Sequence, residues 1–591
     1  MPSNSNNPIT YFAETDFRNK KIRFGIKAVD RAKHMYVIGK TGMGKSTMLE
    51  NMAVQDIQNG EGMAFMDPHG QTADKLLDYI PAERIKDVVY FAPFDMEYPI
   101  SFNVMEDVGY DKRHLVVSGL MSTFKKIWLD AWSARMEYIL NNVLLALLEY
   151  PDATLLGVNR MLSDKDYRKK VVDNVSDPAV KSFWVDEFAK YGDKYMQEAG
   201  AAIQNKIGQF TSNPLIRNII GQPKSSFDVR EIMDNRKIVI INLSKGRVGE
   251  QNASLLGGML ITKIYLGAMS RADVSASVLD KLPNFYLYVD EFQSFANATF
   301  ADILSEARKY KLNLIIAHQY VEQMAEEVRA AVFGNVGTTI TFRVGPFDAE
   351  ILEKVFFPTF TKEDIVNLGF AQIYLSLMVD GVGSKPFSAT TLPPITMQSI
   401  SHKDAIIQHA RDTFARPRKV VEEEIKKWHE PVNPPKPYVP RPIPTTPAQT
   451  IQTPRPTSTP TPPPLPRPVM PIQTQRPIPA PAPRPIPTPI PRPVHQAPSP
   501  VRIVPKPVES APKPVPPPPR VINLSDLVKK TSEQIKPIDQ KGPSEKNLSS
   551  LKDMLAKVAE ENKKIVPPAS PISNQQIPKE VPEHILEKIL E

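Results

Sequence analysis

The chain has 591 residues, which is enough for roughly two or three domains with a sizeable core. It contains no cysteine, which excludes disulfides and thiolate-bound zinc or iron–sulfur sites and suits a cytosolic protein. The net charge of +8 is unevenly spread, because residues 431–520 carry 11 Lys and Arg side chains against one acid and leave the rest of the chain at −2. The basic composition is therefore no sign that the folded part binds nucleic acid.

The N-terminal residues lack the basic and apolar regions of a signal peptide. The longest apolar stretch, Ala253 to Met269, has 17 residues and includes Ser254 and Lys263. We interpret it as a core helix, because a membrane span needs about 20 apolar residues. We therefore expect a cytoplasmic protein without a transmembrane segment of its own.

Residues Gly39 to Ser46 match the phosphate-binding pattern G-x-x-x-x-G-K-[ST], the Walker A motif. The apolar run Met35–Ile38 predicts a buried strand before it, and the helical spacing of apolar residues behind it predicts a helix that ends near Gly60. In that setting backbone N–H groups surround phosphate oxygens at a helix N-terminus. The pattern predicts a P-loop that binds ATP and Mg²⁺ through Gly39, Lys40, Thr41, Gly42, Met43, Gly44, Lys45, Ser46 and Thr47.

Two of these residues have individual roles. Lys45 would contact the β- and γ-phosphates, and the Ser46 hydroxyl would be a Mg²⁺ ligand. The segment Asp67-Pro-His-Gly70 follows the next predicted strand. It is either a simple turn, since Pro and Gly favour turns, or a contact near the nucleotide.

Apolar strands alternate with amphipathic helices between about residues 10 and 430, which predicts an α/β sheet. The expected strands are Met35–Ile38, Met63–Met66, Val88–Phe91, Ile238–Asn242, Phe285–Val289, Leu314–Ala317, Thr338–Phe342 and Ile373–Met378. Between the third and fourth of these the sequence is helical in character and contains three tryptophans. We predict an all-helical domain inserted into the sheet at 109–226.

The complete prediction divides the chain into five parts: the first part of the ATPase domain at 1–108, the inserted helical domain at 109–226, the second part of the ATPase domain at 227–430, a Pro-rich basic linker at 431–520 and a largely disordered tail at 521–591. The linker holds 36 of the 60 prolines, so it can form neither a helix nor a ladder. It is either a spacer or a docking tract for a protein partner or an anionic polymer. Two short amphipathic segments in the tail are expected to be partner-docking helices.

The run Phe285–Val289 ends in Asp290 and Glu291, the form of a Walker B strand. Ligands sit at the carboxyl ends of strands in open α/β sheets, so both acids would reach the nucleotide. Asp290 is the predicted second Mg²⁺ ligand, and Glu291 is the predicted general base that orients the attacking water. The alternative is a strand followed by a solvated acidic turn.

The next strand ends in His318 and Gln319, and an amide at that edge can hydrogen-bond the γ-phosphate or the water. We assign this role to Gln319 and treat His318 as a supporting residue. Arg308 closes the helix between the two strands. It is either a cation favoured by the helix dipole or a finger that reaches the γ-phosphate of a neighbouring subunit. Arg343 competes for the finger role, and we favour Arg308.

The set of motifs made up of the P-loop, Asp67–Gly70, Asp290-Glu291, Arg308 and Ala317–Gln319 resembles the HerA/FtsK group of RecA-like motors. Within that group the chain is most similar to type IV secretion ATPases, the TraG/TraD-like conjugative coupling proteins. The resemblance covers about residues 15–430. It implies a homo-hexameric ring that hydrolyses ATP between subunits and moves DNA, or sometimes protein, through a central pore.

One departure concerns the membrane, because coupling proteins usually carry N-terminal membrane spans. Either a membrane-embedded secretion partner holds this chain at the inner face of the cell membrane, or the chain is a soluble relative. The leading hypothesis is an ATP-driven DNA translocase of the conjugative-transfer type. The alternatives are a HerA-like DNA-processing motor and a secretion or pilus-assembly ATPase that does not act on DNA.

Overall fold

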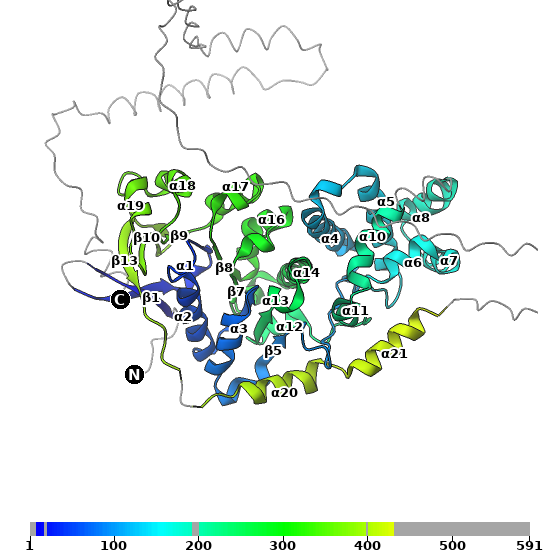
Figure 1. The fold of residues 1–591 in the computed structure, drawn as a ribbon, viewed down its shortest axis with the longest axis horizontal. Helices are drawn as coiled ribbons and strands as arrows, with labels where there is room; N and C mark the ends of the chain where they lie inside the picture. Colours follow the sequence, from blue (N-terminus) through cyan, green and yellow to red (C-terminus); the bar gives the residue numbers. More distant parts are fainter. Residues whose placement is uncertain (1–7, 17–19, 192–199, 398–399, 431–591) are drawn as a thin grey trace, which may run out of the picture. The chain divides into compact units, whose positions relative to one another are not determined.

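The structure, a computed structural model, describes residues 8–16, 20–191, 200–397 and 400–430 (Figure 1). The expected Pro-rich linker and the tail behind it lie outside the described residues. So do the two segments predicted as docking helices.

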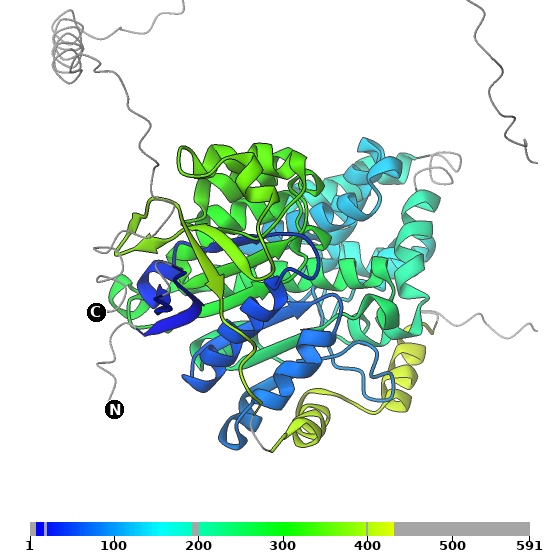
Figure 2. The ribbon, with the colours of Figure 1, turned by 60° about the vertical axis from the view of Figure 1, so that its left-hand side comes forward.

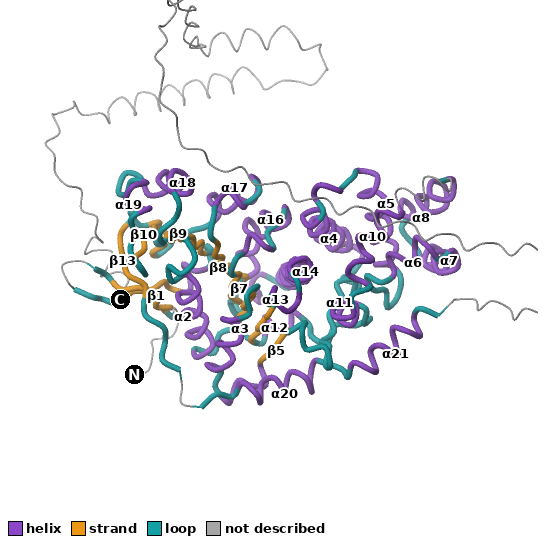
Figure 3. The backbone as a smooth tube through the Cα atoms, in the orientation of Figure 1, coloured by secondary structure: helices purple, strands orange, loops and turns teal. Residues whose placement is uncertain are grey.

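An eleven-stranded sheet forms the centre of the described part, in the order β2-β1-β13-β10-β9-β3-β8-β7-β4-β6-β5 (Figure 3). Its strands are β1 (Ile9–Glu14), β2 (Arg23–Lys27), β3 (Met35–Ile38), β4 (Gly62–Asp67), β5 (Val88–Phe91), β6 (Ile238–Asn242), β7 (Phe285–Val289), β8 (Leu312–His318), β9 (Thr338–Thr341), β10 (Gln372–Ser376) and β13 (Phe387–Thr391). A separate two-stranded ribbon consists of β11 (Met378–Val379) and β12 (Val382–Gly383).

The strands from β9 to β5 in this order are all parallel, whereas β10, β13, β1 and β2 pair antiparallel. The predicted α/β class is confirmed, and all eight predicted strands are present. The prediction missed β1, β2 and β13, which extend the sheet beyond its parallel part.

Each residue of β3, β4, β7 and β8 is buried, as expected of parallel strands that are covered on both faces. Alternate residues of β3 belong to two different cores: Met35 and Val37 pack with α2 (Lys45–Gln58) and α3 (Gln71–Leu76). Tyr36 and Ile38 pack in the core of the opposite face. Figure 2 shows α2 and α3 on one face of the sheet.

Helices between residues 229 and 366 pack on the opposite face. They are α12 (Val229–Asp234), α13 (Lys245–Val248), α14 (Glu250–Met269), α16 (Ala298–Glu306), α17 (Glu326–Asn335), α18 (Pro346–Phe356) and α19 (Lys362–Val366). The short helix α15 (Ala276–Leu279), between α14 and β7 in the chain, has no buried residue. In the part of the chain that the structure describes, one stretch, Glu250–Asp273, is long and apolar enough to cross a membrane. Because 72% of its apolar window is buried inside the protein, α14 is a core helix in this structure, as its serine and lysine predict.

The described residues between β5 and β6 form helices and no strand, and we call residues 110–220 the helical segment. Its longer elements are α4 (Arg113–Ile127), α5 (Ala134–Glu149), α6 (Gly157–Ser163), α7 (Lys165–Asn174), α8 (Pro178–Ser182), α10 (Ala201–Thr211) and α11 (Pro214–Ile220). They lie to the right of the sheet in Figure 1. Local sequence sets several of their starts: for example, Asn213 caps α11, and proline occupies its first turn.

The last two described helices, α20 (Lys403–Phe414) and α21 (Arg418–Trp428), connect the two regions. α20 packs against β5, and Val421 and Ile425 of α21 pack on Leu156 of the helical segment. The expected second part of the ATPase domain thus ends in a helix that contacts the predicted insertion. The boundaries of the predicted domains stay a prediction.

A buried ion pair connects the P-loop helix to the central strand β7. The Arg31 guanidinium donates to both carboxylate oxygens of Asp56, at 2.7 and 2.8 Å, and to the Tyr288 hydroxyl at 2.7 Å. It also stacks 3.6 Å from the centre of the Tyr286 ring. Arg31 and Asp56 are each 1% exposed, so water contributes almost nothing to their solvation.

We predict that Asp56→Ala lowers the free energy of unfolding by about 3–5 kcal/mol, because it leaves the Arg31 charge buried without its partner. Replacing both residues, as in Arg31→Met with Asp56→Leu, should cost less than the single change. Urea unfolding of the full chain, followed by tryptophan fluorescence, measures both. A single variant as stable as the wild type would show that the pair is not what connects α2 to β7.

Candidate functional site

The P-loop lies between β3 and α2, as its sequence predicts. Gly44 precedes α2 with a φ of 113°, a conformation that side chains rarely adopt. A Cβ atom at Gly39 would lie 2.5 Å from Cβ of Phe342, so only glycine allows the loop to approach β9 this closely. Both fixed glycines of the motif are therefore required by the backbone itself.

Lys45 begins α2 and is buried at the bottom of the loop. Its ammonium donates to the carbonyl oxygens of Gly39 at 2.6 Å and Lys40 at 3.3 Å. Burial lowers the pKa of Lys45, while the nearby carboxylates of Glu291 and Asp290 oppose that shift. The residue thus presents an ammonium group where a phosphate chain would be bound by the loop.

Ser46 and Asp290, the two predicted Mg²⁺ ligands, are adjacent: the Ser46 hydroxyl donates to a carboxylate oxygen of Asp290 at 3.0 Å. Burial, together with the charges of Glu291 and Asp67, raises the pKa of Asp290 to about 6. A cation at this point would relieve that repulsion. The described residues contain no group of three or more acidic or histidine side chains that could hold a metal unaided. One hydroxyl and one carboxylate fit Mg²⁺ that takes its other ligands from water and phosphate.

Glu291 follows directly and has a left-handed backbone, with φ of 46° and ψ of 48°. Such a conformation is unfavourable for a residue with a side chain and persists only where the surroundings fix it. Its carboxylate accepts hydrogen bonds from the amides of Gln319, at 2.5 Å, and Gln293, at 2.7 Å. Gln319 in turn accepts from the Thr41 hydroxyl at 2.9 Å. The structure therefore joins the predicted base, the predicted amide and the P-loop in one chain of hydrogen bonds.

These groups surround a cavity of about 490 Å³. It is lined by Thr41, Gly42, Gly44, Lys45, Ser46, Thr47, Asp67, His69, Gln71, Thr72, Asp290, Glu291, Gln319 and Phe370. Asp67 accepts hydrogen bonds from the backbone N–H groups of His69 and Ala73, so the predicted segment Asp67–Gly70 forms a turn. Because Asp67 and His69 line the cavity, the same segment is also part of its wall.

Sequence reasoning missed Gln71 and Thr72 of the cavity wall, and two further residues near this site. Phe370 lines the cavity and is 75% exposed, and an aromatic ring at such a place is suited to stack on a base. The following residue, Ala371, donates its N–H to the Met43 carbonyl at 3.2 Å, which fixes the turn against the P-loop. Gln293, which binds Glu291, is the other. Neither Phe370 nor Gln293 belongs to a motif. The one signal in the sequence was that Gln293 lies two residues after Glu291.

The remaining candidates lie elsewhere. His318 is buried, hydrogen-bonds the Tyr36 hydroxyl through Nδ1 at 3.1 Å, and does not line the cavity. Arg343 lies beside the P-loop of its own chain, since its carbonyl accepts from the Lys40 N–H at 2.8 Å. Arg308 is exposed and precedes β8, whereas Gln319 follows that strand. The seven residues of β8, at about 3.3 Å each, put Arg308 on the order of 20 Å from the cavity edge.

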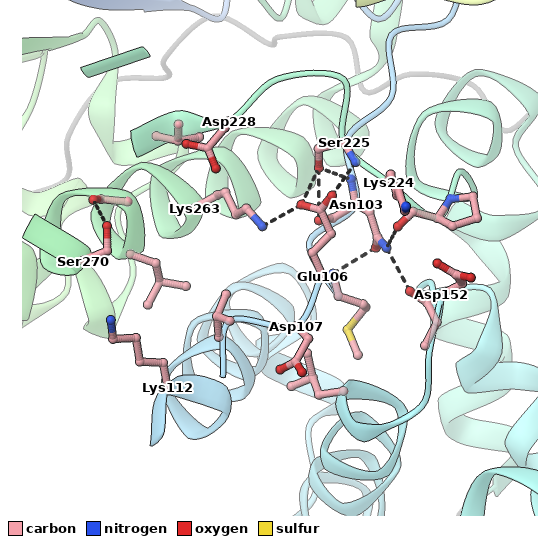
Figure 4. A pocket seen from close by; sticks show the side chains of 18 of the residues that line it. Asn103, Glu106, Asp107, Lys112, Asp152, Lys224, Ser225, Asp228, Lys263 and Ser270 are labelled. Atoms are coloured by element: carbon pink, nitrogen blue, oxygen red, sulfur yellow. Dashed lines mark hydrogen bonds and ion pairs between the residues drawn. The ribbon is translucent and has the colours of Figure 1, made fainter. Parts of the chain in front are cut away.

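A larger cavity, about 850 Å³, lies between the helical segment and the helices α12 and α14 (Figure 4). Glu106 at its centre accepts from Lys263 at 2.8 Å and from the Ser225 hydroxyl at 2.8 Å. The Asn103 amide donates to the carbonyls of Ala153 and Pro223. These bonds join the two connections that enter and leave the helical segment, so the principal polar groups here are used by the fold. We place the reactive chemistry in the P-loop cavity.

Comparison with known proteins supplies a family. The model of the type IV secretion-system coupling protein DNA-binding domain matches residues 24–356. A search of the curated proteins finds no match.

Several solved structures are similar in fold. The plasmid coupling protein TrwB in complex with the GTP analogue GDPNP has 14% sequence identity and a TM-score of 0.47, over 67% of this chain and 97% of TrwB. TrwB in complex with ADP and Mg²⁺ has the same identity and score, over 67% and 98% of the two chains. VirB4 of Thermoanaerobacter pseudethanolicus has 14% identity and a TM-score of 0.41, over 61% and 89%.

The family match begins before the P-loop and ends after β9, so it includes the P-loop, the Walker B acids and Gln319. It confirms the resemblance that these motifs predict. Because it spans more than half of the chain, this protein belongs to the family of type IV secretion-system coupling protein DNA-binding domains.

Proposed function

We propose that this protein is an ATPase that works as a homo-hexameric ring and moves DNA in type IV secretion. The observation that supports hydrolysis is the convergence of Lys45, the Ser46–Asp290 pair and the Glu291–Gln319 pair on one cavity. A site that only bound nucleotide would need Lys45, Ser46 and Asp290. It would not need the Glu291 carboxylate that two amides hold in position.

In this proposal each side chain has one task. Lys45 and the N–H groups of the P-loop bind the phosphates, and Ser46 with Asp290 holds Mg²⁺, which neutralises charge that develops during transfer. Glu291 orients a water molecule and accepts its proton, since its carboxylate is fixed by hydrogen bonds at the edge of the cavity. Gln319 connects that carboxylate to Thr41 and so senses whether the loop is occupied.

Membership of a family described as a DNA-binding domain favours DNA over a protein substrate. The ring is proposed from the resemblance to hexameric RecA-like motors. In such a ring Arg308, which is exposed and remote from the cavity of its own chain, would reach a nucleotide only across a subunit interface. Location at the inner face of the cell membrane, with a membrane-embedded partner, is part of the same proposal.

We predict that double- or single-stranded DNA stimulates ATP hydrolysis by the purified full-length protein, and that the stimulation falls steeply between about 50 and 200 mM salt, because phosphate contacts weaken as counterions accumulate. The measurement is phosphate release with each DNA form, with Lys45→Ala as the blank. Hydrolysis that is indifferent to DNA would favour a secretion-assembly ATPase. Absence of hydrolysis from the wild type would refute the proposed activity.

Glu291→Gln should keep Mg²⁺–ATP bound while kcat falls about 10²- to 10⁴-fold, since the amide cannot accept the proton of the water. Lys45→Ala should instead weaken nucleotide binding itself. Equilibrium binding of a fluorescent ATP and single-turnover hydrolysis separate the two effects. The exposed Glu363→Gln is the matched control and should behave as wild type; a Glu291→Gln protein with normal turnover would exclude Glu291 as the base.

Arg308→Ala should reduce hydrolysis about 10³-fold or more if it is a finger that acts on the neighbouring subunit. Mixed rings of Arg308→Ala and Glu291→Gln subunits should regain part of the activity, because some interfaces then combine an intact finger with an intact base. Lys309→Ala, the exposed neighbour, serves as control. Normal activity of Arg308→Ala, or loss without recovery in mixtures, would remove this assignment and direct attention to Arg343.

A further inference from the structure

The loop that carries Glu291 is held by side chains from outside the P-loop region. We call residues 291–297 the acidic loop. Lys245 donates to the Ser294 hydroxyl at 3.0 Å, and the Ser254 hydroxyl of α14 donates to the Ser294 carbonyl at 2.8 Å. A Cβ atom at Gly257 would lie 2.3 Å from the Phe295 ring, so α14 also approaches the loop as closely as glycine allows.

The helical segment contributes further contacts. Lys126, in the last turn of α4, donates through its ammonium to the carbonyl of Gln293 and, at 2.5 Å, to the carbonyl of Ala296. The Thr123 hydroxyl of the same helix accepts from the Asn297 amide at 3.3 Å. One helix of the helical segment therefore binds the loop at three of its seven residues.

α4 is itself fixed on α14. A Cβ atom at Gly119 would lie 2.3 Å from Thr262, and one at Gly258 would lie 2.7 Å from Thr123. Two glycines on facing helices thus let the backbones approach each other with threonine side chains between them. Because a close-packed contact of this kind has little room to deform, α4 holds a fixed position against α14 and presents Lys126 and Thr123 to the acidic loop from there.

Burying the charged group of Lys126 at this contact is energetically unfavourable. Burial, with a smaller contribution from Lys245, lowers the pKa of Lys126 to about 7. Its hydrogen-bond partners are the backbone carbonyls of Gln293 and Ala296, so among the described residues no carboxylate pairs with the buried ammonium group. This contact affects the site because Lys126 binds the carbonyl of Gln293, and the side-chain amide of Gln293 donates to the Glu291 carboxylate.

We propose that Lys126 is a positioning residue that holds the acidic loop, and through Gln293 the Glu291 carboxylate, in place for hydrolysis. This inference rests on the proposed ATPase function. The connection runs from α4 through the Gln293 backbone to the Gln293 amide and then to Glu291. It makes the rate of hydrolysis, but not the binding of nucleotide, depend on a side chain of the helical segment.

The test is steady-state hydrolysis and equilibrium ATP binding by Lys126→Met, which keeps most of the side-chain volume and removes the charge. We expect kcat to fall about 10- to 100-fold, the cost of a misplaced catalytic group, with KM and the ATP dissociation constant close to wild type. Lys126→Arg, which can still donate to both carbonyls, should recover part of the loss. Lys125→Met, at the exposed neighbour on the same helix, should be normal.

Gln293→Leu provides a second variant with the Lys126 contact intact. It should lower kcat in the same way, and the double variant should be no slower than the slower single one, because both changes interrupt one connection. Normal kcat in Lys126→Met, equal losses in kcat and ATP affinity, or additive effects in the double variant would each overturn the inference. Failure of the wild type to hydrolyse ATP would refute the proposed function instead, so the two failures are distinguishable.

Discussion

The position of α2 against β7 is the constraint on which the rest of the site depends. Two contacts fix it. Near the end of the helix, Asp56 binds Arg31 and the Tyr288 hydroxyl inside the core; at its start, Ser46 binds Asp290. Tyr288 and Asp290 are two residues apart and so lie on the same face of the strand. Because α2 is attached to this part of the chain near both of its ends, the P-loop is held in place relative to Asp290 and Glu291.

The order of the strands brings the remaining groups to the same edge. β3 lies between β9 and β8, with β7 and β4 following, so the P-loop, Gln319, Asp290 and Asp67 leave neighbouring strands at adjacent carboxyl ends. Ligands of open α/β sheets bind at such ends. Here the chemistry of the site follows from connectivity, because residues almost 280 positions apart become neighbours without any long side chain. The hydrogen bond from Thr41 to Gln319 is an example.

Much of this was predictable from the sequence because apolar runs in a covered sheet carry a strong signal. All eight expected strands exist, and Ser46, Asp290, Glu291 and Gln319 meet in one cavity. The antiparallel strands β1, β2 and β13 were missed, because they mix polar with apolar residues and their role is set by long-range pairing. Phe370 and Lys126 could not be predicted either. A single aromatic residue and one of two adjacent lysines form no sequence pattern, and their roles depend on which residues the fold places beside them.

The two sides of the site differ in how they are supported. The P-loop is supported by buried strands and by the attachment of α2 to β7. Neither of these supports involves the helical segment. The side that carries Glu291 has a left-handed backbone and is held by hydrogen bonds from α4, α13 and α14. Because an unfavourable backbone conformation persists only while its surroundings maintain it, loss of these hydrogen bonds would affect Glu291 before it affects the P-loop. In the proposed ATPase, this asymmetry would keep nucleotide bound while the geometry needed for hydrolysis is assembled or lost.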